Sequence, residues 1–246
     1  MLDNRGSLAS TRGSLAGVED SLAIVDLLAQ STTALTPDEV AQRAGIETAT
    51  VVELAEALVH FGLLRPERKK FGLGARAARW GICALQVEQI VAVSNGILTA
   101  LHRTTGFNVA LYLFEPPKVV CIRHIGLIDY EDGPRLGSLY SAHRVAAGRA
   151  MLAFQSYEFI ASFCEEYADL IKNKDFPSDL RSVAKKGYAL TCNDAASNVV
   201  EVSMPILSPL LEPVGAVSLW RSSDVQIDNL LQGLVTELTR STRGIS

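Results

Sequence analysis

Two short helices separated by a glycine turn are the feature that most constrains the fold of this chain. Residues 36–39 read Thr-Pro-Asp-Glu, a strong helix start in which the threonine caps the helix, the proline suits its first position and the glutamate completes a capping box. This helix is expected to end just before Gly45. The next helix is expected over residues 48–61, with Gly62 as its stop. This order predicts a helix-turn-helix.

An amphipathic helix precedes these two helices, and a basic hairpin follows them. Residues 22–29 read LAIVDLLA, with apolar residues at helical spacing. After the second helix of the motif, Leu63 and Leu64 start a strand, the charged segment RPERKK turns it, and FGLG returns it. We therefore expect a winged helix-turn-helix over residues 18–80. A generic three-helix bundle is the alternative interpretation.

Composition indicates a folded chain without membrane spans. The 246 residues are 48% hydrophobic and 20% charged, which supports packed cores, and the length allows two compact units. No apolar run approaches the roughly 18 residues that a membrane helix needs, and residues 1–17 lack the apolar block of a signal peptide. We expect a cytoplasmic protein with a flexible tail over residues 1–17. The four cysteines form no CxxC pair, so we expect free thiols, no metal site and no cofactor.

The C-terminal part is expected to combine helices with strands. The mostly apolar stretch 81–105 predicts a linker helix. Residues 107–114 and 119–125 predict a strand hairpin with the turn EPPK between them. Helical segments are expected up to about residue 173, and the remaining elements are helices at 178–186 and 227–239 and strands at 199–207 and 214–220.

As an ordered set, several stretches of the chain resemble the IclR family of bacterial transcription regulators. They are SLAIVDLLA, LTPDEVAQRAGI, LVHFGLL and FGLGARAARWG in the first part, and LGSLYSAHRVAAGRAMLAF and GYAL in the second. The resemblance implies an α+β fold, in which a winged helix-turn-helix is joined by the linker helix to a GAF-like antiparallel-sheet domain over residues 106–246. It also implies a homodimer or homotetramer and an effector pocket between the sheet and the loop around His143.

At the positions that line the effector pocket in the family pattern, this chain carries different residues, so the resemblance implies a changed pocket. Residues expected to contact a ligand are His143, Arg144, Val145, Ala146, Thr191, Val199, Glu201, Ser218 and Trp220. Strand alternation places Val199 and Glu201 on one face, so Glu201 points where a ligand would lie. A carboxylate inside a domain needs a partner, and we expect Glu201 to pair with Arg144 or to contact a polar ligand, with a cavity-filling ion pair as the alternative. Trp220 offers a flat wall that favours a bulky or aromatic effector, unless it is simply part of the core.

The recognition helix departs from what DNA binding favours. Its predicted exposed positions carry Thr48, Thr50, Val52, Glu53, Glu56 and His60, so two carboxylates would face a polyanion. Residues 1–94 contain nine basic and eleven acidic side chains, a net charge of −2. The basic wing supplies the clearest phosphate-binding residues, which are Arg65, Arg68, Lys69 and Lys70. With Thr48 and Thr50 they form the expected DNA interface, although a wing can also be basic merely because it is solvated.

Two functions of different class follow from these patterns. The favoured one is a ligand-responsive transcription regulator that binds DNA through the winged helix and a small, bulky or aromatic effector through the C-terminal domain. The alternative is an IclR-like protein that has lost DNA recognition and uses the same pocket as a small-molecule binder or as an acid/base enzyme, in natural-product biosynthesis for example. No nucleophile motif or glycine-rich cofactor loop accompanies the pocket residues, which leaves enzymatic activity open.

Overall fold

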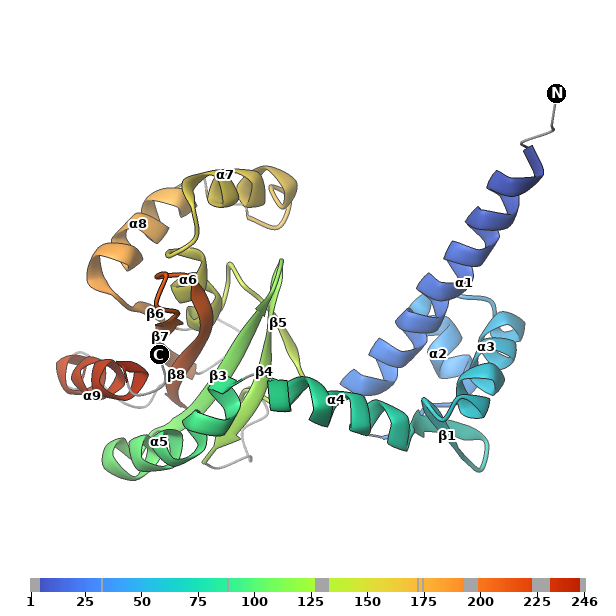
Figure 1. The fold of residues 1–246 in the computed structure, drawn as a ribbon, viewed down its shortest axis with the longest axis horizontal. Coiled ribbons are helices and arrows are strands. Elements are labelled where there is room, and N and C mark those ends of the chain that lie inside the picture. Colours follow the sequence, from blue (N-terminus) through green and yellow to red (C-terminus); the bar gives the residue numbers. More distant parts are fainter. Residues whose placement is uncertain are drawn as a thin grey trace. The chain divides into compact units, whose positions relative to one another are not determined.

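The computed structural model describes residues 5–31, 33–87, 89–126, 133–171, 173, 175–192, 199–222 and 231–243. These residues divide into two compact units, with the boundary between residues 87 and 88. Unit 1 contains α1 (Arg5–Gln30), α2 (Pro37–Ala44), α3 (Thr48–His60), β1 (Leu64–Glu67), β2 (Lys70–Leu73) and α4 (Ala75–Val87), shown in Figure 1. No helix within the described ranges is long and apolar enough to cross a membrane.

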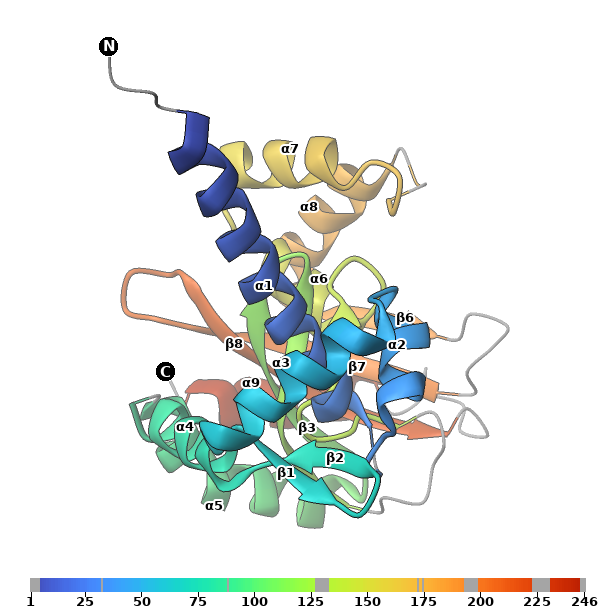
Figure 2. The same cartoon turned by 90° about the vertical axis from the view of Figure 1, so that its right-hand side faces the viewer.

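The helix-turn-helix of unit 1 forms for the reasons that its sequence indicates. The Thr36 hydroxyl accepts a hydrogen bond from the Glu39 N–H at 3.2 Å, and the Glu39 carboxylate accepts one from the Thr36 N–H at 2.7 Å, which confirms the capping box. Gly45 ends α2 in the left-handed conformation with φ 70°, a backbone shape that favours glycine. The α1, α2 and α3 helices lie against one another (Figure 2). In the core that they share, Ile24, Val51 and Ala55 are almost fully buried.

The wing is a two-stranded antiparallel hairpin, as predicted. Its strands pair from Leu64 opposite Leu73 to Glu67 opposite Lys70. The charged segment therefore does more than turn the chain, because most of it lies within the two strands and only residues 68 and 69 form the turn. Unit 1 is thus a helix-turn-helix with a wing, and its core residues lie at the predicted spacing.

Two expected segments look different in the structure. The expected flexible tail covers residues 1–17, but α1 already includes residues 5–17, since no proline interrupts this Ala- and Leu-containing stretch and a helix docked at one end extends readily. Residues 1–4 lie outside the described residues. The expected linker helix 81–105 corresponds to the end of α4 and to α5 (Gln89–Thr105), with residue 88 between them outside the described residues.

Unit 2 is built on a six-stranded antiparallel sheet in the order β5-β4-β3-β8-β7-β6. The strands are β3 (Asn108–Glu115), β4 (Lys118–Ile125), β5 (Leu139–Ser141), β6 (Ala189–Cys192), β7 (Val199–Leu207) and β8 (Pro213–Ser222). Its helices, besides α5, are α6 (Ala146–Leu152), α7 (Tyr157–Glu166), α8 (Phe176–Lys186) and α9 (Leu231–Arg243). The predicted strand 199–207 and hairpin 107–125 are confirmed, and the α+β fold class with them. The expected final helix began at 227, but residues 223–230 lie outside the described residues.

Helices cover both faces of this sheet, as Figure 1 shows. On one face, α5 and α9 pack on alternate strand residues such as Leu111, Val202 and Leu219. On the other face, α6 packs on β7 and β8, with α8 beside it. The short helix α6 approaches the chain before it so closely because Gly148 lies directly against the backbone of Ala142. This second face, under α6, carries the polar residues that the sequence analysis singled out.

Candidate functional site

Glu201 occupies the centre of the candidate site, on the face of β7 that lies under α6. Its neighbours in the sheet are Thr191 on β6 and Trp220 on β8. The predicted alternation holds, since Val199 packs with the residues under α6 whereas Val200 and Val202 pack under α5 and α9. Glu201 is only 8% exposed, which is unusual for a carboxylate.

The Glu201 carboxylate is held by the first turn of α6. Its Oε2 accepts a hydrogen bond of 2.9 Å from the backbone N–H of Ala146, the first residue of that helix. A carboxylate is favourable at a helix N-terminus, where free N–H groups and the helix dipole point toward it. Burial nevertheless raises the pKa of the Glu201 carboxyl above its ordinary value, while the nearby Ser218 hydroxyl and the N–H groups of α6 act in the opposite direction.

Three buried polar side-chain atoms around this site have no hydrogen bond of good geometry among the described residues. They are Oε1 of Glu201, the hydroxyl oxygen of Ser218 and Nε2 of His124, and all three are shielded from solvent. Ser218 lies on β8 opposite Ser203, whose hydroxyl instead donates to the Val217 carbonyl oxygen at 3.1 Å. Buried polar groups are nearly always hydrogen-bonded, so three such atoms around one site indicate where a polar group of a ligand could bind.

Arg144, which was expected as one possible partner of Glu201, lies elsewhere. Its side chain is exposed, and no ion pair joins it to Glu201 within the described part of the chain. The reason lies in the local backbone, because the turn at residues 142–144 directs Ala146 rather than Arg144 toward β7. Of the other two residues in this loop, Val145 forms the N-cap of α6 and packs on the core. His143 is half-buried, with its ring against Phe176 of α8 at 6.5 Å between centroids.

Aromatic side chains surround the buried carboxylate. Trp220 is 1% exposed, and its ring lies 5.5 Å from that of His124 with a tilt of 33°. Tyr112 on β3 is buried, and its ring meets that of Tyr140 edge-on at 6.2 Å. Burial first and the Glu201 charge second raise the pKa of Tyr112 well above its ordinary value. The site therefore has flat apolar walls around a small polar centre.

Tyr112, Cys121 and His124 also belong to this face, although none of them was predicted as a site residue from the sequence. Tyr112 and Cys121 are cross-strand partners on β3 and β4, and both pack under α6. Burial raises the pKa of the Cys121 thiol to about 12, so it is an inert side chain and no nucleophile. The alternation of the 107–125 hairpin could have placed Tyr112, because Ala110 and Tyr112 share a face. Among the described residues, no cluster of His, Cys, Asp or Glu side chains is arranged to hold a metal ion.

In unit 1, the side chains expected to face DNA are mostly exposed. Glu53 and Glu56 lie on the open side of α3, while Val51, Ala55 and Leu58 form its buried side. Thr48 is exposed and its hydroxyl donates to the Asp38 carboxylate at 3.3 Å, and Thr50 is half-buried.

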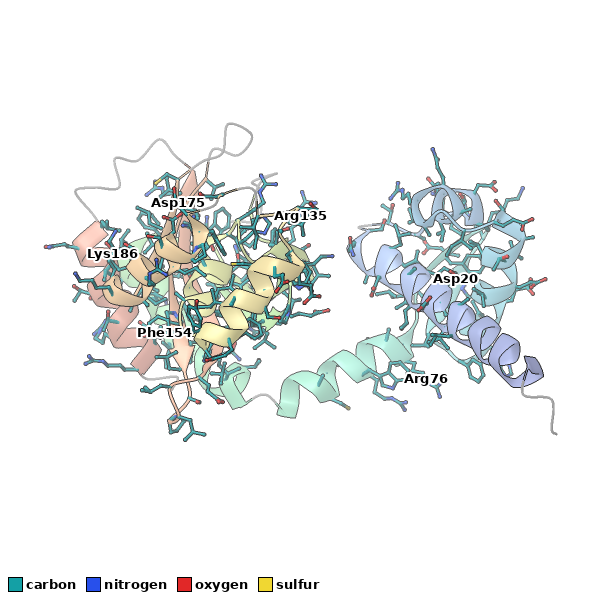
Figure 3. The ribbon with its side chains drawn as sticks, turned by 90° about the horizontal axis from the view of Figure 1, so that it is seen from above. Asp20, Arg76, Arg135, Phe154, Asp175 and Lys186 are labelled. Carbon is teal, nitrogen blue, oxygen red and sulfur yellow. The ribbon has the colours of Figure 1, made fainter. Side chains whose placement is uncertain are left out.

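Three of the four wing cations extend from the hairpin tip into solvent. They are Arg68, Lys69 and Lys70, all exposed, whereas Arg65 forms an ion pair with Glu67 at 3.1 Å. Arg76 on α4, which Figure 3 labels, lies with its guanidinium 5.8 Å from the centre of the exposed Trp80 ring. Basic charge in unit 1 is therefore concentrated at the wing, beside an acidic recognition helix.

A helix-turn-helix with a basic wing, followed by a sheet domain with a buried polar site, defines a transcription regulator with an effector-binding domain. Family models agree with this class: the IclR helix-turn-helix domain matches residues 18–68, and the C-terminal domain of the bacterial transcriptional regulator IclR matches residues 82–246. The chain therefore belongs to the IclR family of transcription regulators.

Individual relatives and solved structures agree with this assignment. The acetate operon repressor of Salmonella typhimurium is 25% identical over 214 residues, which are 80% of this chain and 77% of the repressor. The IclR transcriptional regulator of Alicyclobacillus acidocaldarius has a TM-score of 0.77 at 17% identity, covering 94% of this chain and 97% of that one. An IclR homolog from Microbacterium hydrocarbonoxydans, solved in complex with 4-hydroxybenzoate, has a TM-score of 0.72 at 18% identity, covering 92% and 97%.

Proposed function

We propose that this chain is a ligand-responsive transcription regulator whose effector is a small aromatic molecule bound beside Glu201 under α6. The buried Glu201 carboxylate and the Ser218 hydroxyl near it carry the proposal, since neither Oε1 of Glu201 nor that hydroxyl makes a hydrogen bond of good geometry and a bound polar group would satisfy both. The aromatic walls of Trp220, His124 and Tyr112 match a flat ligand better than a two- or three-carbon acid. The 4-hydroxybenzoate complex of one IclR homolog supports an aromatic class of ligand in this fold.

DNA contact is assigned to α3 and to the β1–β2 hairpin. The exposed cations Arg68, Lys69 and Lys70 provide most of the attraction to phosphate, and Thr48 and Thr50 lie at the start of α3, the end that enters the major groove in helix-turn-helix proteins. Glu53 and Glu56 weaken this attraction. Glu53 can still accept a hydrogen bond from a cytosine amino group. Such a contact would favour DNA sequences with cytosine at that position, although the Glu53 charge lowers the overall affinity for DNA.

The chain is expected to act as a homodimer or a homotetramer, because paired half-sites in DNA need paired recognition helices. The exposed apolar residues of α1 support a second copy as partner. Leu15, Val18 and Leu22 are 58%, 53% and 59% exposed and lie three and four residues apart, the spacing of a helix-helix seam. Trp80 and Ile82 on α4 are also exposed. Replacing the three α1 residues with serine is expected to weaken the oligomer, so that analytical ultracentrifugation measures an assembly of lower mass than that of the wild type.

Binding of a fluorescent DNA duplex, measured by anisotropy at several salt concentrations, tests the proposed DNA interface. Changing the three wing cations Arg68, Lys69 and Lys70 to alanine is expected to lower the slope of log affinity against log salt by about 2–3, since each lost phosphate contact removes about 0.9. Arg181, Lys185 and Lys186 supply a matched control in unit 2, because they are also one arginine and two lysines and all are exposed. Equal effects of both triple changes would show that the wing does not contact DNA.

A further inference from the structure

The carboxylate of Glu201 occupies the backbone donor at the start of α6. The first N–H of α6 is an orphan donor of the kind that binds anions, and here it donates to Glu201 Oε2 at 2.9 Å. Glu201 reaches it from β7, on the opposite side of the site. An incoming carboxylate therefore finds this donor occupied.

Among the residues that the structure describes, no positive side chain forms an ion pair with Glu201. The cationic residue of α6, Arg149, pairs instead with Asp179 of α8 at 3.5 Å and lies over the Phe176 ring. Arg144 is exposed. Two carboxylates in one buried site disfavour each other's ionised forms, so a second anion is poorly tolerated beside Glu201.

The polar atoms of the site that lack a hydrogen bond of good geometry favour a ligand that brings a hydrogen-bond donor. Oε1 of Glu201 can only accept when the group is ionised, and the Ser218 hydroxyl beside it can accept or donate. Hydrogen bonds from a cationic or neutral N–H to a carboxylate are stronger than those between two neutral groups. The surrounding rings of Trp220 and Tyr112 suit an aromatic body that carries such a donor.

We propose that Glu201 makes this site selective for aromatic effectors that present an N–H or O–H donor, neutral or cationic, and that it excludes aromatic carboxylates. This inference rests on the proposed effector site, and it names the class of ligand. It separates the chain from the homolog that binds 4-hydroxybenzoate, an aromatic acid.

Three probes of nearly equal size and shape test the selectivity: benzamidine as a cation, benzamide as a neutral donor and benzoate as an anion. Binding is followed at pH 7.5 by the fluorescence of Trp220 in the full chain carrying Trp80→Phe, which removes the other of the two tryptophans. We expect benzamidine to bind at least tenfold more tightly than benzoate, with benzamide between them. Glu201→Gln is expected to reduce this ratio at least tenfold, by weakening benzamidine and strengthening benzoate.

Two further variants separate a role in ligand selection from a role in folding alone. Glu158→Gln removes an exposed carboxylate at the start of α7 and is expected to leave all three affinities unchanged. Ser218→Ala keeps the Glu201 charge, so it is expected to weaken benzamide several-fold while the preference of benzamidine over benzoate remains.

The wild-type comparison needs no variant at the site and decides the proposal even if Glu201→Gln does not fold. Benzoate binding as tightly as benzamidine, or no binding of any of the three probes at millimolar concentration, would overturn it. So would a Glu201→Gln protein that binds the three probes in the wild-type order and ratio. Failure of the DNA-binding function would instead appear in the salt-slope experiment and would leave the probe selectivity intact.

Discussion

Gly148→Ala tests whether the close contact of α6 holds the candidate site together. An added Cβ would lie 2.6 Å from the Ala142 carbonyl carbon, and even closer to two other backbone atoms of that residue, where contacts below 3.0 Å essentially do not occur. Backbone cannot move aside as a flexible side chain can, so α6 must shift by about 1 Å away from the chain that it packs on.

The expected cost combines three contributions. Overpacking of this kind costs about 1–3 kcal/mol. The shift also disrupts the hydrogen bond from Ala146 to the Glu201 carboxylate, worth about 1.5–3 kcal/mol for a charged acceptor. Alanine in place of glycine within a helix returns about 1 kcal/mol. We therefore expect Gly148→Ala to lower the free energy of unfolding of unit 2 by about 2–5 kcal/mol, a fall in Tm of roughly 5–15 °C.

Urea unfolding followed by Trp220 fluorescence, again with Trp80→Phe, reports this change in unit 2 alone. Gly96→Ala is the matched control, since Gly96 also lies within a helix of unit 2 and an added Cβ meets nothing within 4 Å. The control is expected to gain about 0.5–1 kcal/mol. A Gly148→Ala protein as stable as this control would refute the close packing of α6.

Three further predictions concern the cap of α2, the buried carboxylate and the recognition helix. Thr36→Ala removes the side-chain half of the capping box and is expected to destabilise unit 1 by about 1 kcal/mol, measured by thermal unfolding. The raised pKa of Glu201 means that folding favours its protonated form. Its contribution to stability is therefore fully present below the ordinary pKa of 4.5 and is lost as pH rises through the pKa of the folded protein. Urea unfolding measured at several pH values should show this loss in wild type but not in Glu201→Gln. The double change Glu53→Arg and Glu56→Arg is expected to strengthen DNA binding and steepen the salt slope by up to about 2.

Each of these predictions has an outcome that contradicts it. Unchanged thermal unfolding of the Thr36→Ala protein would show that the observed cap contributes nothing. If wild type and Glu201→Gln lose stability equally as pH rises, the buried carboxylate is not the titrating group. Glu158→Arg with Glu165→Arg makes the same charge change on exposed positions of α7. An equal gain in DNA affinity from this control would show that α3 does not face DNA.

Local signals in the sequence predicted much of unit 1 and the strands of unit 2. The capping box at Thr36 and Glu39, the left-handed Gly45 and the alternation of residues 199–203 each depend on residues close in the chain. Such signals place an element and its buried face. The same alternation places Glu201 on the face of β7 that α6 covers.

The partner of Glu201 could not be predicted in the same way. Arg144 was attractive because opposite charges pair, but the atom that Glu201 contacts is a backbone N–H of Ala146, 55 residues earlier in the chain. Backbone donors carry no residue-type signal, and only the packing of α6 on the sheet brings this one close. The same packing gathers Tyr112 and His124 at the site from two other strands.

The measurement that tests the regulator function most directly is DNase I footprinting of the full chain at low salt on the DNA upstream of its own gene. We expect protection of two half-sites whose centres are separated by about one helical turn or a multiple of it, as paired recognition helices require. The protection should be lost in the protein with Arg68, Lys69 and Lys70 changed to alanine. No protection by the wild-type protein, in a preparation whose effector site still binds benzamidine, would contradict this function and indicate a ligand-binding member of the family that has lost DNA recognition.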